Sequence, residues 1–278
     1  MQLKCNIIKN LLDASFKEDF GIKGDITSDS VIDKHAEIEF SINNRQEAVL
    51  CGIQIAKYYL DNYSTAKYTI HKFDSDIIKP GDALISGHGN GREILLIERI
   101  ILNYLQHLTG ISTLTHKFVQ EVRGTEAKIL DTRKTTPMLR ALQKYAVTCG
   151  GGYNHRLALD SSIMIKDNHI SICGSVTKAI QNAKKYNPHY AKIEIECDTI
   201  DQVKEAIEEG VDIILLDNMT IDQTNKSLKI INKKAKVEAS GNISLETVRQ
   251  IAETGVDYIS IGKITHSAPS ADIGLDIK

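Results

Sequence analysis

Ionisable side chains recur in this chain at the ends of short apolar segments that have the composition of β-strands. In a parallel α/β barrel the carboxyl ends of the strands and the loops after them form one functional face. Because several such ends carry polar or charged groups, we expect them to line one site. The segments in question end in Asp131-Thr132-Arg133-Lys134, Lys166-Asp167-Asn168-His169, Glu196, Asp217-Asn218, Ser240-Gly241 and Gly262-Lys263.

The cations of this set indicate an anionic ligand. Arg133, Lys134, His155, Arg156 and Lys166 are all candidates to converge on the same face. Guanidinium groups bind carboxylates and phosphates through paired hydrogen bonds. Several of them at one face therefore fit a ligand with more than one anionic group.

Two carboxylates are placed to serve a metal ion or a developing positive charge. Lys192, Glu194 and Glu196 alternate with apolar residues, so they should share the inner face of their strand. We expect Glu194 to pair with Lys192, and Glu196 and Asp217 to face the ligand. Carboxylates near phosphates usually bind Mg²⁺, which prefers oxygen ligands. Stabilisation of a cation and binding of sugar hydroxyls are the alternatives.

Small residues at the ends of the last two predicted strands indicate a phosphate site. Ser240-Gly241-Asn242 and Gly262-Lys263 occupy these positions. Barrels often bind phosphate there through backbone amides.

Strands and helices alternate through the last 150 residues, which predicts βαβ units and a parallel sheet. EEGVDIILLD (208–217) and ETGVDYISIG (253–262) form an internal repeat, with Gly210 and Gly255 in the left-handed position that ends a helix. We expect Ser244 to be an N-cap, Thr199 to form a capping box with Gln202, and Thr136-Pro137 to begin a helix that ends at Gly150-Gly151-Gly152. The predicted strands are 127–131, 163–166, 192–197, 212–216, 236–239 and 257–261, and the helices between them are 175–186, 199–209, 221–232 and 244–254.

The strand and helix pattern of the first hundred residues predicts a separate domain. Segments 36–43, 47–52 and 67–73 resemble strands of an antiparallel sheet. A long apolar helix then runs from about Arg92 to Leu108 and ends at Gly110, with Arg99, Asn103 and Gln106 on one stripe. We place the domain boundary at the end of this helix.

Composition excludes several classes of protein. The 278 residues contain 34 Lys and Arg against 36 Asp and Glu, a net charge of −2, which excludes nucleic-acid binding through bulk positive charge. No apolar run approaches the ~20 residues that cross a bilayer, and the N-terminus lacks a signal-peptide pattern, so we expect a cytoplasmic protein without membrane partners. The five cysteines include no C-x-x-C pair, so neither a zinc site nor a disulfide framework is indicated.

Specific motifs resemble the quinolinate phosphoribosyltransferase family over nearly the whole chain. DTRKTTPMLRALQKYAVTCGGGYNHRLAL carries the strongest resemblance, and IKDNHI, IEIE, LLDNM, EASGNI, ISIGKITHSAPSADIGLDI, ERIILNYLQHLTGIST and EDFGIKGDITS add to it. The resemblance implies an α/β fold: an N-terminal α/β sandwich over residues 1–108, to which the tail 267–278 returns, and an incomplete, seven-stranded α/β barrel over 109–266. The implied reaction transfers phosphoribose from phosphoribosyl pyrophosphate to quinolinate, and yields nicotinate mononucleotide, pyrophosphate and CO₂.

The resemblance also implies roles for named residues. Glu196, Asp217, Lys134 and Lys166 would be catalytic, and Glu196 and Asp217 would hold Mg²⁺, directly or through water. Arg133, His155, Arg156 and Lys166 would bind quinolinate, together with Arg99 from the partner subunit of a homodimer or of a larger assembly such as a hexamer. The residues implied for phosphoribosyl pyrophosphate are Lys134, Glu196, Asp217, Ser240, Gly241, Asn242, Gly262, Lys263 and His266. Met138, Ala158 and Asn242 depart from the family pattern, since they replace usual glycines.

Four other functions fit parts of the pattern. A molybdenum-transport-associated paralogue resembles this family, but IKDNH and the intact NHR argue against it. Nicotinate phosphoribosyltransferase would need fewer cations, because its substrate has one carboxylate. A Schiff-base aldolase would use Lys166 as a desolvated nucleophile, whereas Lys166 lies among polar groups. A phosphosugar-binding module without catalysis would leave Glu196 and Asp217 without a role.

Overall fold

The computed structural model describes residues 8–189 and 191–278, which form two compact units. The first unit comprises the described residues up to His116, Thr136–Gly151 and Ser267–Lys278, and the second comprises Lys117–Thr135 and the described residues of Gly152–His266. No helix of the described residues is both long enough and apolar enough to cross a membrane.

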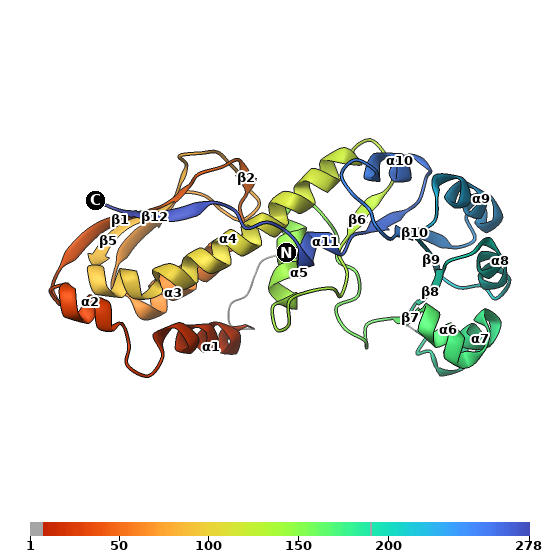
Figure 1. Cartoon of the computed structure of the whole chain (residues 1–278), viewed down its shortest axis with the longest axis horizontal. Coiled ribbons are helices and arrows are strands. Elements are labelled where there is room, and N and C mark those ends of the chain that lie inside the picture. Colours follow the sequence, from red (N-terminus) through yellow and green to blue (C-terminus); the bar gives the residue numbers. More distant parts are fainter. Residues whose placement is uncertain (1–7, 190) are drawn as a thin grey trace. The chain divides into compact units, whose positions relative to one another are not determined.

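An antiparallel sheet forms the centre of the first unit, with strand order β12-β1-β5-β3 (Figure 1). The C-terminal strand pairs with β1 in the register Ile42↔Leu275, so the tail belongs to this unit. Phe40, Ile42 and Ile85 of the sheet are buried in its core. The strands are β1 (Glu37–Asn44), β3 (Lys67–Ile70), β5 (Ala83–Asn90) and β12 (Ile273–Ile277), with a separate pair β2 (Ala48–Val49) and β4 (Ile77–Ile78); the helices are α1 (Lys9–Phe20), α2 (Ile26–Val31), α3 (Ile53–Tyr63), α4 (Gly91–Glu121) and α5 (Arg140–Cys149).

Helix α4 does not end at Gly110, so the predicted end of this helix is wrong. The helix continues to Glu121, and the predicted boundary between residues 108 and 109 lies inside it. Gly110 is needed for another reason: a Cβ atom there would lie 2.0 Å from the carbonyl oxygen of Pro269. The glycine therefore makes room for the C-terminal tail of the same unit.

The second unit is an open parallel sheet with strand order β6-β11-β10-β9-β8-β7. Among the described residues it has six strands, where seven were expected. A single parallel bridge between Leu130 and Tyr153 occupies the outer side of β6, where a seventh strand would lie. Figure 1 shows α8 and α9 along the outer side of the strands. The strands are β6 (Lys128–Leu130), β7 (Ile163–Ile165), β8 (Ile193–Cys197), β9 (Ile213–Asp217), β10 (Lys236–Ser240) and β11 (Tyr258–Ser260); the helices are α6 (Asp167–Cys173), α7 (Val176–Tyr186), α8 (Ile200–Glu208), α9 (Ile221–Ile231), α10 (Val248–Glu253) and α11 (Lys263–His266).

Local sequence signals explain most helix ends of this unit. The capping box of Thr199 and Gln202 is confirmed, since each side chain bonds the other residue's backbone N–H. Gly210 and Gly255 adopt φ values of 67° and 94°, as predicted. Ser244 is not an N-cap, because α10 begins only at Val248, after an intervening turn.

The start of α5 also differs from the prediction. Thr136-Pro137 does not begin the helix, which starts at Arg140. The residues between form a turn in which Met138 has φ 66° and its side chain is exposed. A non-glycine residue in this left-handed region cannot continue a right-handed helix. The predicted helix N-terminus beside Arg133 and Lys134 is therefore absent from the described structure.

Candidate active site at the carboxyl ends of the barrel strands

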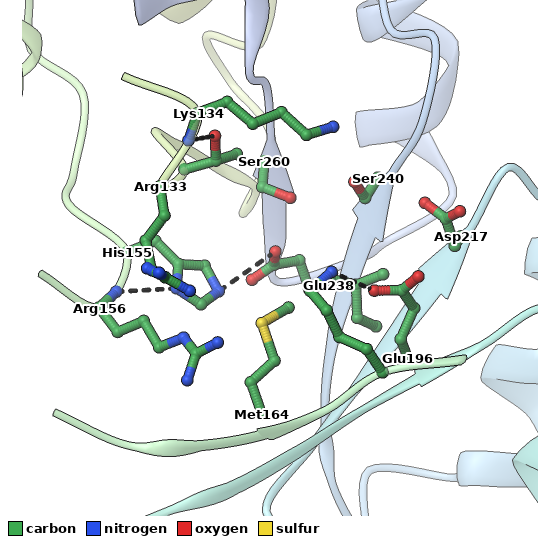
Figure 2. Close-up of a pocket in the computed structure, with 13 residues that line it drawn as sticks. Arg133, Lys134, His155, Arg156, Met164, Glu196, Asp217, Glu238, Ser240 and Ser260 are labelled. Atoms are coloured by element: carbon green, nitrogen blue, oxygen red, sulfur yellow. Dashed lines mark hydrogen bonds and ion pairs between the residues drawn. The ribbon is translucent and has the colours of Figure 1, made fainter. Parts of the chain in front are cut away.

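A cavity of about 350 Å³ opens where the strands of the second unit end (Figure 2). Every strand of the parallel sheet contributes to it, through its last residues or the loop that follows. Eight of the residues predicted from the sequence are brought together here. The lining residues are Thr132, Arg133, Lys134, His155, Arg156, Met164, Lys166, Glu196, Leu215, Asp217, Glu238, Ser240 and Ser260.

Two arginines form the cationic side of the cavity. The Nε atoms of Arg133 and Arg156 are both buried and make no hydrogen bond with any described residue. One terminal nitrogen of Arg156 donates to the carbonyl oxygen of Ser162 at 3.1 Å. Burial and the neighbouring charge of Arg133 lower the pKa of Arg156. Unsatisfied, buried guanidinium nitrogens are costly, and an anionic ligand in the cavity would satisfy them.

His155 is held by the protein at both ring nitrogens. Its Nδ1 accepts a hydrogen bond from the backbone N–H of Arg156 at 2.8 Å, so the ring proton lies on Nε2. Nε2 lies 3.2 Å from the carboxylate of Glu194 and 3.6 Å from that of Glu238. The backbone N–H of His155 donates to buried Asp131 at 2.8 Å. This network fixes the loop that presents Arg156.

Glu194 and Glu238 are buried acids inside the barrel, and the sequence reasoning did not assign either to the site. The expected pairing of Glu194 with Lys192 is wrong, because Glu194 faces His155. Burial, followed by the charge of Glu194, raises the pKa of Glu238 to about 7. The alternation that places Glu196 inside the barrel applies equally to Lys236, Glu238 and Ser240, so that signal could have identified Glu238.

Carboxylates gather on the opposite side of the cavity. Single oxygen atoms of Glu196, Asp198 and Asp217 all lie within 4.8 Å of one another. Burial and the charges of Glu196 and Asp167 raise the pKa of Asp198, as expected where carboxylates crowd together. Oxygen ligands at this spacing fit Mg²⁺. Lys166 Nζ donates to Glu196 at 2.6 Å and already neutralises part of the cluster.

Close backbone packing shapes the loop after β10. A Cβ atom at Gly241 would lie 2.2 Å from the side-chain oxygen of Asn218, so only glycine fits there. Asn242 follows with φ 48° and donates from its side chain to that same oxygen at 3.1 Å. Asparagine tolerates this left-handed conformation better than most residues do.

The loop after β11 brings Gly262 against Lys134. A Cβ atom at Gly262 would lie 2.9 Å from Cδ of Lys134 and 3.3 Å from the ring of His266. Thr265 also donates its hydroxyl to the carbonyl oxygen of Lys134 at 2.7 Å. Lys263 and His266 are exposed on the short helix α11. These residues therefore gather next to the cavity, although only Lys134 lines it.

Arg99 does not line this cavity. It is exposed on α4 in the first unit and makes no hydrogen bond or ion pair with the described residues. Gln106, expected on the same stripe, instead donates to the carbonyl oxygen of Ile273 in the tail. Within the described chain Arg99 is thus an unpaired cation, whereas Gln106 of the same predicted stripe has a structural role.

Comparisons with known proteins agree over the full length. The family model described as quinolinate phosphoribosyl transferase, N-terminal domain, matches residues 25–109, and the model of the C-terminal domain matches 111–276. A probable nicotinate-nucleotide pyrophosphorylase [carboxylating] of Bacillus subtilis is 42% identical over 97% of this chain and 93% of its own length. The Mycobacterium leprae nicotinate-nucleotide pyrophosphorylase [carboxylating] is 38% identical over 94% of this chain and 93% of its own.

Solved structures give the same result. A crystal structure of nicotinate-nucleotide pyrophosphorylase from Ehrlichia chaffeensis has a TM-score of 0.95 and 46% identity, and the match covers 100% of both chains. Human nicotinic acid phosphoribosyltransferase has a TM-score of 0.65 at 11% identity, with 100% of this chain and 74% of that chain covered. At that identity the likeness shows a shared fold alone.

Proposed function

The chain belongs to the quinolinate phosphoribosyltransferase family, and we propose that the cavity of its second unit is the site of the reaction. The enzyme is a nicotinate-nucleotide pyrophosphorylase (carboxylating), a pentosyltransferase of NAD biosynthesis. It joins the phosphoribose of phosphoribosyl pyrophosphate to quinolinate and releases pyrophosphate and CO₂. The observation that carries the site assignment is the pair of buried arginines, each with an unsatisfied Nε, facing a cluster of carboxylates across one cavity.

Quinolinate binds at the cationic side in this proposal. Its two adjacent carboxylates accept hydrogen bonds from Arg133 and Arg156, whose free nitrogens then gain partners. Lys166 guides the 2-carboxylate, and His155 supports the loop of Arg156. Lys166 is engaged by Glu196 in an ion pair of 2.6 Å, which argues against the free, desolvated amine that a Schiff-base mechanism needs.

The phosphoribosyl group binds at the acidic side. Displacement of pyrophosphate develops positive charge on the ribose, which Glu196 and Asp217 stabilise while they bind its hydroxyls. Glu196 and Asp217 would hold Mg²⁺ directly or through water, and the bound ion would neutralise charge on the pyrophosphate. Asp198 lies close enough to join these ligands.

The 5-phosphate lies over the loops after the last two strands. Ser240, Gly241 and Asn242 offer polar groups after β10, and Gly262, Lys263 and His266 offer them after β11. Lys134 reaches across to this side. Together these contacts orient the anomeric carbon toward the pyridine nitrogen.

We propose further that the active unit is a homodimer or a larger assembly such as a hexamer, in which Arg99 reaches the partner subunit's quinolinate. Its exposure and lack of a partner within the described chain support this role. A cytoplasmic location, predicted from the sequence, stays part of the proposal and is testable by cell fractionation.

Incubation with phosphoribosyl pyrophosphate and Mg²⁺ tests the function directly. Quinolinate should be converted to nicotinate mononucleotide with stoichiometric CO₂, and nicotinate should not be a substrate. A nicotinate-specific reaction would favour the second phosphoribosyltransferase class, and phosphoribosyl pyrophosphate binding without turnover would favour a binding module. Gel filtration of the same sample reports the assembly.

A further inference from the structure

Glu238 is a buried acid in the cavity that the proposed reaction has not used. Glu238 is 2% exposed and lies near the end of β10, and its carboxyl group lines the cavity. Oε1 is buried and has no hydrogen-bond partner among the described residues. Figure 2 shows this carboxyl pointing into the site, with His155 on one side and Glu196 on the other. An unsatisfied carboxyl oxygen at this depth is costly, so a role for it is expected.

The groups around Glu238 favour its protonated form. Burial is the largest cause of its raised pKa, and the negative charge of Glu194 is the next. The pKa of Glu238 is lowered by His155, by the Ser260 hydroxyl and by the more distant Lys166, but these effects are smaller and it remains raised to about 7. The ring proton of His155 lies closer to Glu194 than to Glu238. Near neutral pH, Glu238 can therefore be protonated and act as a general acid.

The proposed reaction needs such a proton. Loss of CO₂ breaks the bond between ring carbon C2 and its carboxylate, and the electron pair stays on C2, next to the alkylated, cationic nitrogen. The product carries hydrogen at C2, so one proton must be delivered there in each turnover. Arginine cannot supply it, because guanidinium does not deprotonate in proteins.

We propose that the carboxyl group of Glu238 protonates C2 after CO₂ has left, an assignment that rests on the proposed function. The O–H bond of Glu238 breaks, its electron pair remains on the carboxylate, and the C2 electron pair forms the new C–H bond. The carboxylate then regains a proton from water after product leaves. Figure 2 shows the carboxyl group of Glu238 between the arginines and Glu196. A pyridine ring whose carboxylates meet the arginines, and whose nitrogen faces a ribose at the acidic side, would lie next to this carboxyl group. Lys166, another possible donor, is held by Glu196.

Glu238→Gln tests the assignment, because it keeps the shape of the side chain and removes the acidic proton. We expect kcat to fall about a hundredfold, while KM for quinolinate and for phosphoribosyl pyrophosphate changes by less than about threefold. In the wild type, kcat should decline as the pH rises through about 7, as Glu238 loses its proton. This decline should be absent from the residual rate of the variant.

Glu194→Gln is the matched variant, since it alters the same buried cluster and leaves Glu238 able to donate. Removing the charge of Glu194 lowers the pKa of Glu238, so the decline in kcat should persist and move to lower pH. Glu238→Asp keeps an acid and should retain the decline even if Glu238→Gln folds poorly. The assignment is overturned if Glu238→Gln keeps the wild-type kcat and pH profile, or if Glu194→Gln leaves the midpoint unmoved. A wild-type enzyme that does not convert quinolinate would instead refute the proposed function itself.

Discussion

The ammonium group of Lys166 lies 2.6 Å from Oε2 of Glu196, and this ion pair joins the cationic and acidic sides of the cavity. The two residues lie side by side at the ends of adjacent strands, because β7 and β8 are parallel neighbours with Ile165 opposite Ile195. A substrate carboxylate would compete with Glu196 for the ammonium group of Lys166. Ligand binding at the cationic side would therefore exchange this ion pair for contacts between Lys166 and the substrate.

Removal of either arginine should abolish most activity. Arg133→Ala and Arg156→Ala each lose a charge-assisted contact to a quinolinate carboxylate, so kcat/KM should fall at least about a hundredfold. Arg156→Lys should recover only a small part, because an ammonium group cannot reproduce the planar, bidentate contact. Steady-state kinetics with varied quinolinate measures these effects.

Arg249→Ala is the control for the arginine variants. Arg249 is in the same unit, but it pairs with Glu253 and with backbone carbonyl groups away from the cavity. Its loss should leave kcat/KM unchanged. Wild-type turnover of quinolinate by Arg133→Ala would rule out the assigned contact.

The acidic cluster should affect turnover more than quinolinate binding. Glu196→Gln and Asp217→Asn should lower kcat by about two orders of magnitude or more, since they remove charge that opposes the developing cation. KM for quinolinate should change much less. Asp217→Asn should also raise the Mg²⁺ concentration needed for half-maximal rate, measured by titration after chelation. Retention of full kcat by both variants would contradict this mechanism.

Mixing two inactive variants tests whether subunits share sites. If Arg99 serves the partner subunit, Arg99→Ala and Arg133→Ala homomers are each inactive, and a mixed dimer has one intact site. Subunit exchange should then restore up to about a quarter of the wild-type activity, from the statistical fraction of mixed dimers and their single site. Exchange must be demonstrated separately, for instance by native mass spectrometry. Continued inactivity after exchange would show that Arg99 does not act across the interface.

The sequence predicts the strand ends well because two local signals agree there. The capping box of Thr199 fixes where α8 begins, and the glycines at 210 and 255 fix where helices end. The apolar segments between these signals leave few choices for the strands. The predictions that were wrong depended on contacts between residues distant in sequence. Gly110 looks like a helix end, but Pro269 lies against it. Glu238 was not predicted as a site residue because the expected pattern concerns strand ends, and Glu238 lies two positions before the last residue of β10.

Met138 gives a prediction about local strain. Its φ of 66° places an exposed methionine in the left-handed region, where the family pattern has glycine. The conformation costs about 1–2 kcal/mol for a residue with a Cβ. Glycine removes this strain, but it also makes the unfolded chain more flexible, which cancels part of the gain in stability. Met138→Gly should thus raise the free energy of unfolding by about 0.5–1 kcal/mol, measured by denaturant titration. Met138→Ala, which keeps the Cβ, should show no such gain.

The raised pKa of Glu238 predicts how stability depends on pH, independently of catalysis. Its pKa moves from an ordinary 4.5 to about 7 in the folded chain, so the folded state binds the proton more tightly than the unfolded state. Stability is therefore lost as the pH rises between these two values, by an amount on the order of 3 kcal/mol. Glu238→Gln cannot titrate, so this part of the pH dependence should vanish from it.

The measurement is the free energy of unfolding at about pH 5 and about pH 8, compared between the wild type and Glu238→Gln. The difference between the two pH values isolates the titration, because any cost of a buried amide is present at both. Glu208→Gln, at an exposed position on α8, should retain the wild-type difference. If Glu238→Gln and the wild type lose the same free energy of unfolding over this interval, then Glu238 is ionised in the folded protein near neutral pH. In that case Glu238 cannot be the proton donor of the reaction.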